Sequence, residues 1–172
     1  MTGKIKTCTL QDLKTLQQVS RTTFTDTFGA ANTPADLAEY LDTAYSDAQL
    51  TQEMQQPTAQ FAFILVAGQV AGYLKLNWGA SQSEHRGEAT LEIERIYILP
   101  EFKRQGLGRQ FYDYAVATAK QLNCRTIWLG VWEHNQPAQK FYHRLGFHPV
   151  GDHVFQLGED AQRDLILEKT LV

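Results

Sequence analysis

The sequence has few cysteines, and their positions suit neither cross-linking nor metal binding. Cys8 and Cys124 lie far apart, and neither belongs to a CxxC pair or to a cysteine–histidine ligand spacing. We expect both to be free thiols, in or near the core, in a reducing compartment. The chain therefore has no disulfide framework, and no metal site is expected.

Long apolar runs and a strong charge of one sign are also lacking. The first residues, MTGKIKTCTL, contain no apolar segment typical of a secretion signal, and the longest apolar stretch, residues 61–68, has only strand length. The net charge is −3, and the basic residues are scattered apart from Lys103, Arg104 and Arg109. We therefore expect a cytoplasmic protein without a membrane or nucleic-acid partner, whose mildly acidic surface suits a cationic small molecule.

The length and the order of apolar patterns predict one domain spanning residues 1–172. Helices are expected to begin at three capping residues, Thr9, Thr33 and Ser46. Strands are predicted over residues 4–8, 60–67, 70–78, 90–99, 126–131, 147–155 and 164–171, with a two-residue turn at 68–69 and further helices over 107–122 and 135–145. This order predicts an α/β fold with a mixed central β-sheet of about seven strands and helices on both faces.

A loop between a predicted strand and a predicted helix contains Gly106 and Gly108. Glycines let backbone N–H groups approach a ligand closely, and the start of a helix favours an anion. Lys103, Arg104 and Arg109 add positive charge, so we interpret this loop as a cradle for a diphosphate. Taken alone, such a loop is more often an ordinary strand-to-helix turn, and it matches neither a P-loop nor the dinucleotide fingerprint.

Three matches in the correct order resemble the GNAT acetyltransferase superfamily. Residues 103–108 read KRQGLG against the diphosphate motif Q/R-x-x-G-x-G/A, with lysine in the first position. Residues 96–100, IYILP, are similar to the preceding strand, and residues 135–147, NQPAQKFYHRLGF, to the later helix. The strings LEIERIYI and WLGVWEHN further resemble the PaiA type of bacterial spermidine/spermine acetyltransferase.

The resemblance implies an N-acetyltransferase in which an amine attacks the thioester of acetyl-CoA directly, with acetyl-CoA as cosubstrate and no metal. The residues expected to contact acetyl-CoA are Ile96, Tyr97, Ile98, Lys103, Arg104, Gln105, Gly106, Leu107, Gly108, Arg109, Asn135 and Lys140. For Asn135, a plain helix cap is an alternative role that is compatible with the first.

Catalysis requires that the amine lose a proton and that the leaving thiolate gain one. An alkyl ammonium has a pKa of about 10.4, so neutralising it near pH 7.4 costs roughly 4 kcal/mol. Tyr142 matches the general acid of the family; the alternative is a packing tyrosine. Glu92 and Glu94 lie two apart on a strand and face one side. Glu92 matches the family's general base, whereas a salt bridge to Arg95 or Lys75 is the alternative for either carboxylate.

Aromatic faces and carboxylates near the expected acceptor groove suit a polyamine such as spermidine or spermine. The residues expected there are Phe28, Glu39, Tyr40, Trp78, Trp132 and Glu133, with Asp26 as a further anchor for an ammonium group. Alternatives are a protein N-terminal or lysine acetyltransferase, and a non-catalytic acyl-CoA sensor. A monomer or homodimer is expected. Surface or packing roles are predicted for four histidines, His134, His143, His148 and His153.

Overall fold

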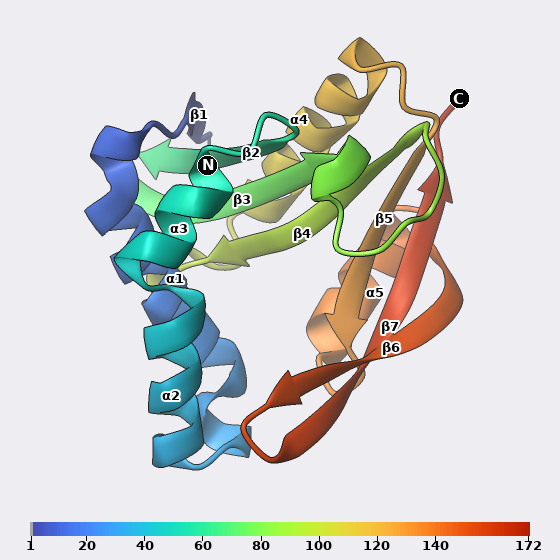
Figure 1. The fold of residues 1–172 in the computed structure, drawn as a ribbon. Coiled ribbons are helices and arrows are strands. Elements are labelled where there is room, and N and C mark those ends of the chain that lie inside the picture. Colours follow the sequence, from blue (N-terminus) through green and yellow to red (C-terminus); the bar gives the residue numbers. More distant parts are fainter. Residues whose placement is uncertain (1) are drawn as a thin grey trace.

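Seven strands form one mixed sheet in the computed structural model, which describes residues 2–172 (Figure 1). The strands are β1 (Lys4–Thr7), β2 (Ala59–Val66), β3 (Gln69–Trp78), β4 (Thr90–Ile98), β5 (Thr126–Trp132), β6 (His148–Leu157) and β7 (Asp160–Thr170). Their order is β1-β2-β3-β4-β5-β7-β6, and only β4 and β5 are parallel neighbours. The predicted mixed α/β sheet is confirmed.

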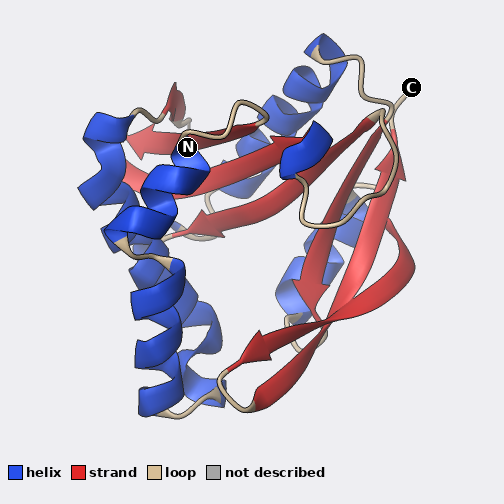
Figure 2. Ribbon diagram, viewed as in Figure 1, coloured by secondary structure: helices blue, strands red, loops and turns tan. Residues whose placement is uncertain are grey.

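Helices cover both faces of this sheet, as the sequence predicts (Figure 2). They are α1 (Leu13–Phe28), α2 (Pro34–Ala44), α3 (Asp47–Met54), α4 (Leu107–Gln121) and α5 (Gln136–Arg144). Side chains of α1, α2 and α3 pack with Phe63 and Tyr73 on one face. Side chains of α4 and α5 pack with Leu74 and Ile93 on the other face. Alternating strand residues therefore feed two separate apolar cores.

The helix starts follow from local side-chain chemistry. The Thr33 hydroxyl accepts a hydrogen bond from the Asp36 N–H at 3.2 Å, and the Ser46 hydroxyl accepts one from the Gln49 N–H at 3.1 Å. Both contacts satisfy N–H groups that have no partner within the helix. At Thr9 a short 3-10 turn, Leu10–Asp12, precedes α1, so the α-helix itself begins later than the sequence pattern predicts.

Two predicted boundaries are wrong. The turn between β2 and β3 is formed by Ala67 and Gly68, with φ angles of 50° and 78°, rather than by residues 68–69. The last two strands are longer than predicted, because β6 and β7 pair as far as Leu157 and Asp160. Most of β6 is solvent-exposed, so this part of the hairpin has no strong apolar alternation in the sequence.

The parallel pair β4 and β5 separates after a short contact. Pairing is limited to Thr90 with Thr126, Leu91 with Ile127 and Glu92 with Trp128. Beyond these residues the two strands diverge, and the β6–β7 hairpin crosses the opening towards α2 (Figure 1). This V-shaped gap between β4 and β5 leaves backbone groups of both strands without a sheet partner, and it positions the candidate site.

Within residues 2–172, none of the helices has the combination of length and apolar character that crossing a bilayer requires.

Candidate active site

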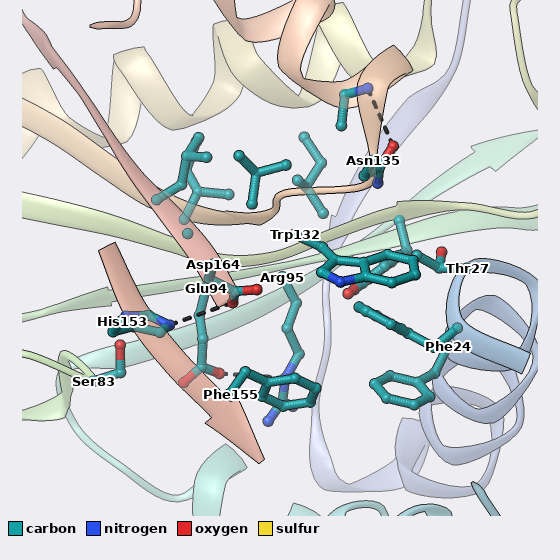
Figure 3. A pocket seen from close by; sticks show the side chains of 18 of the residues that line it. Phe24, Thr27, Ser83, Glu94, Arg95, Trp132, Asn135, His153, Phe155 and Asp164 are labelled. Atoms are coloured by element: carbon teal, nitrogen blue, oxygen red, sulfur yellow. Dashed lines mark hydrogen bonds and ion pairs between the residues drawn. The ribbon is translucent and has the colours of Figure 1, made fainter. Parts of the chain in front are cut away.

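A cavity of about 500 Å³ occupies the gap between β4 and β5 (Figure 3). Its walls come from α1, α2, β4, β5, α5 and the β6–β7 hairpin. Residues of α5 reach it from one face of the sheet, and residues of α1 and α2 from the other. Two substrates could therefore meet in the gap from opposite faces.

Backbone groups of β4 point into the gap. The Leu99 N–H donates to the Ala71 carbonyl of β3 at 2.8 Å. Because hydrogen-bonding directions alternate along a strand, the N–H groups of Ile98 and Ile96 face β5, which no longer pairs at this level. Such N–H groups fit the carbonyl oxygen of a thioester. The backbone of Tyr97 is turned to β3 instead, and its side chain lines the cavity.

A β-bulge brings acidic and basic side chains of β4 to one face. Lys75 pairs with Arg95 and Leu76 with Ile93, so Glu94 is the extra residue between them. The strand kinks here, as bulges beside functional sites commonly do. Glu92, Glu94 and Arg95 all line the cavity as a result.

Glu92 is buried, with 3% of its surface exposed, and its partners are uncharged. Its carboxylate accepts hydrogen bonds from the Asn77 side-chain amide at 3.0 Å, the Ser83 N–H at 2.7 Å and the Ser83 hydroxyl at 2.5 Å. Burial raises the pKa of Glu92, and the hydrogen bonds from Ser83 and Asn77 oppose that shift. Glu92 is thus held firmly, without an ion pair.

Glu94 belongs to a largely buried ion cluster with Lys75, Arg95 and Glu53. Its carboxylate lies 2.7 Å from the Lys75 ammonium and 3.3 Å from Arg95 Nε. Glu53 of α3 lies 2.8 Å from the same ammonium and 3.0 Å from Arg95 Nη1. The salt-bridge alternative therefore describes Glu94 and does not describe Glu92.

Tyr142 reaches the cavity from α5 and is only 6% exposed. Its ring packs edge-on against Phe141 and Phe147, with centroid distances of 5.2 and 5.5 Å. Burial raises the pKa of Tyr142, so its hydroxyl keeps its proton near neutral pH. Among residues 2–172 the hydroxyl has no hydrogen-bond partner, which leaves it free to donate to a ligand in the cavity.

The loop before α4 has the geometry expected of an anion site. Gly106 precedes the first helical residue, Leu107, with φ 81°, a conformation that favours glycine. The N–H groups of the first turn of α4 lack partners within the helix. Two of the expected cations are already paired: Lys103 with Asp26 of α1 at 2.6 Å, and Arg109 with Asp113, its neighbour one helical turn on, at 3.1 Å.

Helix α5 connects this loop to the cavity. A side-chain carbon at Gly108 would lie 3.5 Å from the Phe141 ring, so the start of α4 packs directly on α5. The next residue, Tyr142, lines the cavity together with Asn135 and Ala138. Asn135 caps α5 by accepting the Ala138 N–H at 3.3 Å, while Lys140 is exposed on the same helix and lies outside the cavity lining. A ligand reaching from the α4 loop into the cavity would follow α5.

The expected acceptor residues divide into two groups. Phe28, Tyr40 and Trp132 line the cavity, and Phe28 lies 5.0 Å from Trp132 between ring centroids. Glu39 is exposed on α2, whereas Trp78 packs against the core on the α4 side of the sheet.

Two expected acidic anchors are engaged elsewhere. Glu133 lines a smaller, separate pocket and lies 3.4 Å from Arg163, and Asp26 is paired with Lys103.

Several cavity residues were not expected from the sequence. Phe155 and His153 follow strand alternation on β6, but the pattern there is too weak to indicate a buried face. Ser83 and Glu84 lie in an irregular loop that carries no periodic signal. The unexpected residues that line the cavity include Phe24, Thr27, Tyr45, Ser83, Glu84, His153, Phe155 and Asp164. In the part of the chain that the structure describes, no cluster of three or more histidine, cysteine or acidic side chains is arranged to hold a metal ion.

Comparisons with known proteins agree with this geometry. A family model described as the acetyltransferase (GNAT) family matches residues 19–147. An uncharacterized N-acetyltransferase of Lactobacillus delbrueckii subsp. lactis is 42% identical over the full length of both chains. A PaiA N-acetyltransferase of Thermoplasma acidophilum, solved with coenzyme A, superposes with a TM-score of 0.81 at 21% identity, covering 99% of this chain and 100% of that one. A ribosomal-protein alanine N-acetyltransferase of Escherichia coli superposes with a TM-score of 0.73 at 16% identity, covering 98% and 94%.

Proposed function

The chain belongs to the acetyltransferase (GNAT) family, and we propose that this acetyl-CoA-dependent N-acetyltransferase acts on a small amine with more than one cationic group, such as spermidine or spermine. The observation that carries the proposal is the charge and shape of the acceptor side of the cavity, the part lined by α1, α2 and the β6–β7 hairpin.

Carboxylates outnumber cations in the cavity wall. The acidic residues are Glu84, Glu92, Glu94 and Asp164, and the basic residues are Arg95 and His153. The charge of Arg95 is balanced by Glu94 and Glu53, so a negative potential remains for a ligand. The aromatic rings of Phe24, Phe28, Trp132 and Phe155 add faces that attract ammonium groups.

The β6–β7 hairpin bridges the acceptor side to α2, which favours a small molecule over a polypeptide. The tip of the β6–β7 hairpin packs on α2, where a side chain at Gly158 would collide with the Asp36 carboxylate. The Gln162 amide also donates to Asn32 at 3.2 Å. Phe155 adds a ring contact to Tyr40 at 5.5 Å. A peptide backbone would have to part these contacts before it could cross the cavity.

Residues of the cavity and of the α4 loop provide the groups that acetyl transfer needs. The N–H groups of Ile96 and Ile98 would stabilise negative charge developing on the acetyl oxygen, and the start of α4 would hold the diphosphate. Tyr142 would protonate the leaving sulfur. Of the two strand carboxylates, we expect Glu92 rather than Glu94 to assist removal of the ammonium proton, because Glu94 is paired with Lys75 and Arg95.

A thiol-release assay with acetyl-CoA tests the proposal. The panel contains spermidine, spermine, a lysine peptide and a peptide with a free N-terminal alanine. We expect the highest kcat/KM for a polyamine. A higher value for either peptide would replace the proposal with a protein acetyltransferase, the activity that the name of the Escherichia coli neighbour describes for that protein.

A further inference from the structure

A histidine with no role so far lies in the acceptor wall of the cavity. His153 of β6 has its Nε2 atom 3.3 Å from an oxygen of Asp164 on β7 (Figure 3). Its Nδ1 atom lies 3.3 Å from an oxygen of Glu84. Each ring nitrogen thus faces a carboxylate. The side chain is 29% exposed, so the ring contacts both the cavity and solvent.

The surrounding fold makes room for this ring. A side-chain carbon at Gly130 of β5 would lie 3.3 Å from Cε1 of His153 and 3.5 Å from the Asp164 carboxylate. Because Gly130 has no side chain, the imidazole and the carboxylate can lie directly over β5. This places them beside the gap through which an acceptor amine must pass, on the same face as Glu92 and Trp132.

The carboxylates across the gap are poorly placed to receive a proton directly. Both oxygens of Glu92 accept hydrogen bonds from Asn77 and Ser83, and Glu94 is held by two cations. Glu92 is connected to His153 through the chain, because it accepts a hydrogen bond from the Ser83 N–H, and the adjacent residue, Glu84, contacts the imidazole.

We propose that the imidazole of His153 accepts the proton of the acceptor ammonium, that Asp164 positions the ring, and that Glu92 positions the Ser83–Glu84 segment. In neutral histidine, Asp164 holds the Nε2–H, and Nδ1 presents its lone pair towards Glu84. The ammonium group displaces Glu84 from its 3.3 Å contact with Nδ1, donates one N–H to Nδ1, which takes that proton, and donates another N–H to the Glu84 carboxylate. The imidazolium that results has a carboxylate beside each ring nitrogen, and the structure shows these two nitrogen–oxygen contacts at 3.3 Å.

The proton balance closes over one turnover. The neutral amine forms the new C–N bond as the C–S bond breaks. Tyr142 protonates the sulfur and recovers its proton from the new amide nitrogen. His153 releases its proton to solvent, so one proton leaves for each acetyl group transferred.

Other charges near His153 are few and paired. Arg86 lies 4.0 Å from Glu84 and 3.8 Å from Glu168, and on β6 itself Asp152 is turned to Arg163 at 2.7 Å. Burial raises the pKa of Asp164, and contact with His153 opposes that shift. Glu84 and Asp164 are therefore the two carboxylates that contact the imidazole directly.

The test is the pH dependence of kcat/KM for His153→Gln, measured with spermidine or with the lysine peptide, whichever is the better acceptor. The wild type should show a plateau between neutral pH and the amine pKa of about 10.4, because its base removes the proton from the ammonium. The variant depends on amine that is already neutral. Its kcat/KM should be about 10³-fold lower at pH 7 and rise tenfold per pH unit, approaching the wild type near pH 10.

Two controls distinguish this role from a structural one. His148→Gln replaces an exposed histidine on the same strand and should keep the wild-type profile. Asp164→Asn should move the acid limb of the profile to lower pH, because the imidazolium loses a stabilising charge. The proposal is overturned if His153→Gln stays within threefold of the wild type at pH 7. It is equally overturned if that variant loses the same factor at every pH, or if Asp164→Asn leaves the acid limb in place.

Discussion

The ammonium group of Lys103 lies 2.6 Å from the carboxylate of Asp26. Lys103 occupies the first position of the diphosphate motif, and Asp26 belongs to the last turn of α1, directly before Thr27 and Phe28 of the cavity wall. One ion pair therefore joins the loop that we assign to acetyl-CoA with the helix that borders the acceptor. An incoming diphosphate must compete with Asp26 for Lys103.

Asp26→Asn should strengthen the binding of acetyl-CoA. Removing the carboxylate leaves Lys103 available and takes a negative charge away from an anionic ligand. Because the pair is partly exposed, we expect KM for acetyl-CoA to fall only about two- to fivefold, and the difference to disappear in high salt. Asp42→Asn, which breaks the Arg21 pair at 3.1 Å between α1 and α2, is the matched control. An unchanged or higher KM for Asp26→Asn contradicts the assignment of Lys103.

Tyr142→Phe should lower turnover and leave folding nearly unchanged. The hydroxyl has no hydrogen-bond partner among residues 2–172, while the ring contacts to Phe141 and Phe147 survive the change. Loss of a positioned proton donor typically costs 10²–10⁴-fold in rate, and we expect this loss mainly in kcat. Steady-state kinetics and thermal melting of this variant measure both effects. A kcat within a few-fold of the wild type, with chemistry rate-limiting, would mean that Tyr142 only packs.

Glu92→Gln should mainly lower kcat/KM, whereas Glu94→Gln should mainly lower thermal stability. The amide at position 92 removes a buried charge but keeps partners for Asn77 and Ser83, so we expect unchanged or higher thermal stability. Its kcat/KM should fall about tenfold, less than for His153→Gln, because Glu92 acts through the Ser83–Glu84 segment. Glu94→Gln should lower the melting temperature, because Lys75 and Arg95 lose a counter-charge. If Glu92→Gln instead lowered the melting temperature and Glu94→Gln lowered kcat/KM, the roles assigned to Glu92 and Glu94 would have to be exchanged.

Strong local signals in the sequence predicted most of the fold. Thr33 and Ser46 stand at helix starts because their hydroxyls satisfy free N–H groups, and Gly106 precedes α4 because its φ is positive. The separation of β4 from β5 lies beyond such local signals. No local sequence pattern predicts this separation, since it depends on how α4, α5 and the β6–β7 hairpin pack around the sheet.

The acceptor side was less predictable, because its walls join distant segments. Strand periodicity placed Glu92 and Glu94 on one face, but the bulge that separates their environments arises from pairing with Lys75. His153 was predicted to be a surface or packing residue. Its two carboxylate partners come from an irregular loop and from β7, and no spacing within the sequence connects them.

Glu53→Gln should destabilise the protein in a pH-dependent manner. Burial would raise the pKa of Glu53, but Arg95 and Lys75 outweigh it and lower the pKa below the ordinary value of 4.5. A carboxylate with a lowered pKa in the folded state stabilises at neutral pH, and this contribution is lost as the pH falls through the folded value. We expect a cost of about 3 kcal/mol at pH 7 that shrinks below about pH 4.5.

Denaturant unfolding of Glu53→Gln and of the wild type, measured in buffers between about pH 3 and pH 8, checks this expectation. Asp47→Asn is the control, because its ion pair with Lys14 is exposed and its loss should change the free energy of unfolding little. A difference between Glu53→Gln and wild type that is constant with pH would contradict the charge argument and leave only packing.

If the acceptor carries a second cationic group, two amines with the same four-carbon chain should differ as substrates. The measurement is kcat/KM for 1,4-diaminobutane and for butylamine under saturating acetyl-CoA. The carboxylates and aromatic rings of the cavity predict a preference for the diamine of at least about tenfold, or about 1.4 kcal/mol, that shrinks as salt is added. Equal values, or a preference for butylamine, would mean that the acceptor needs no second cationic group.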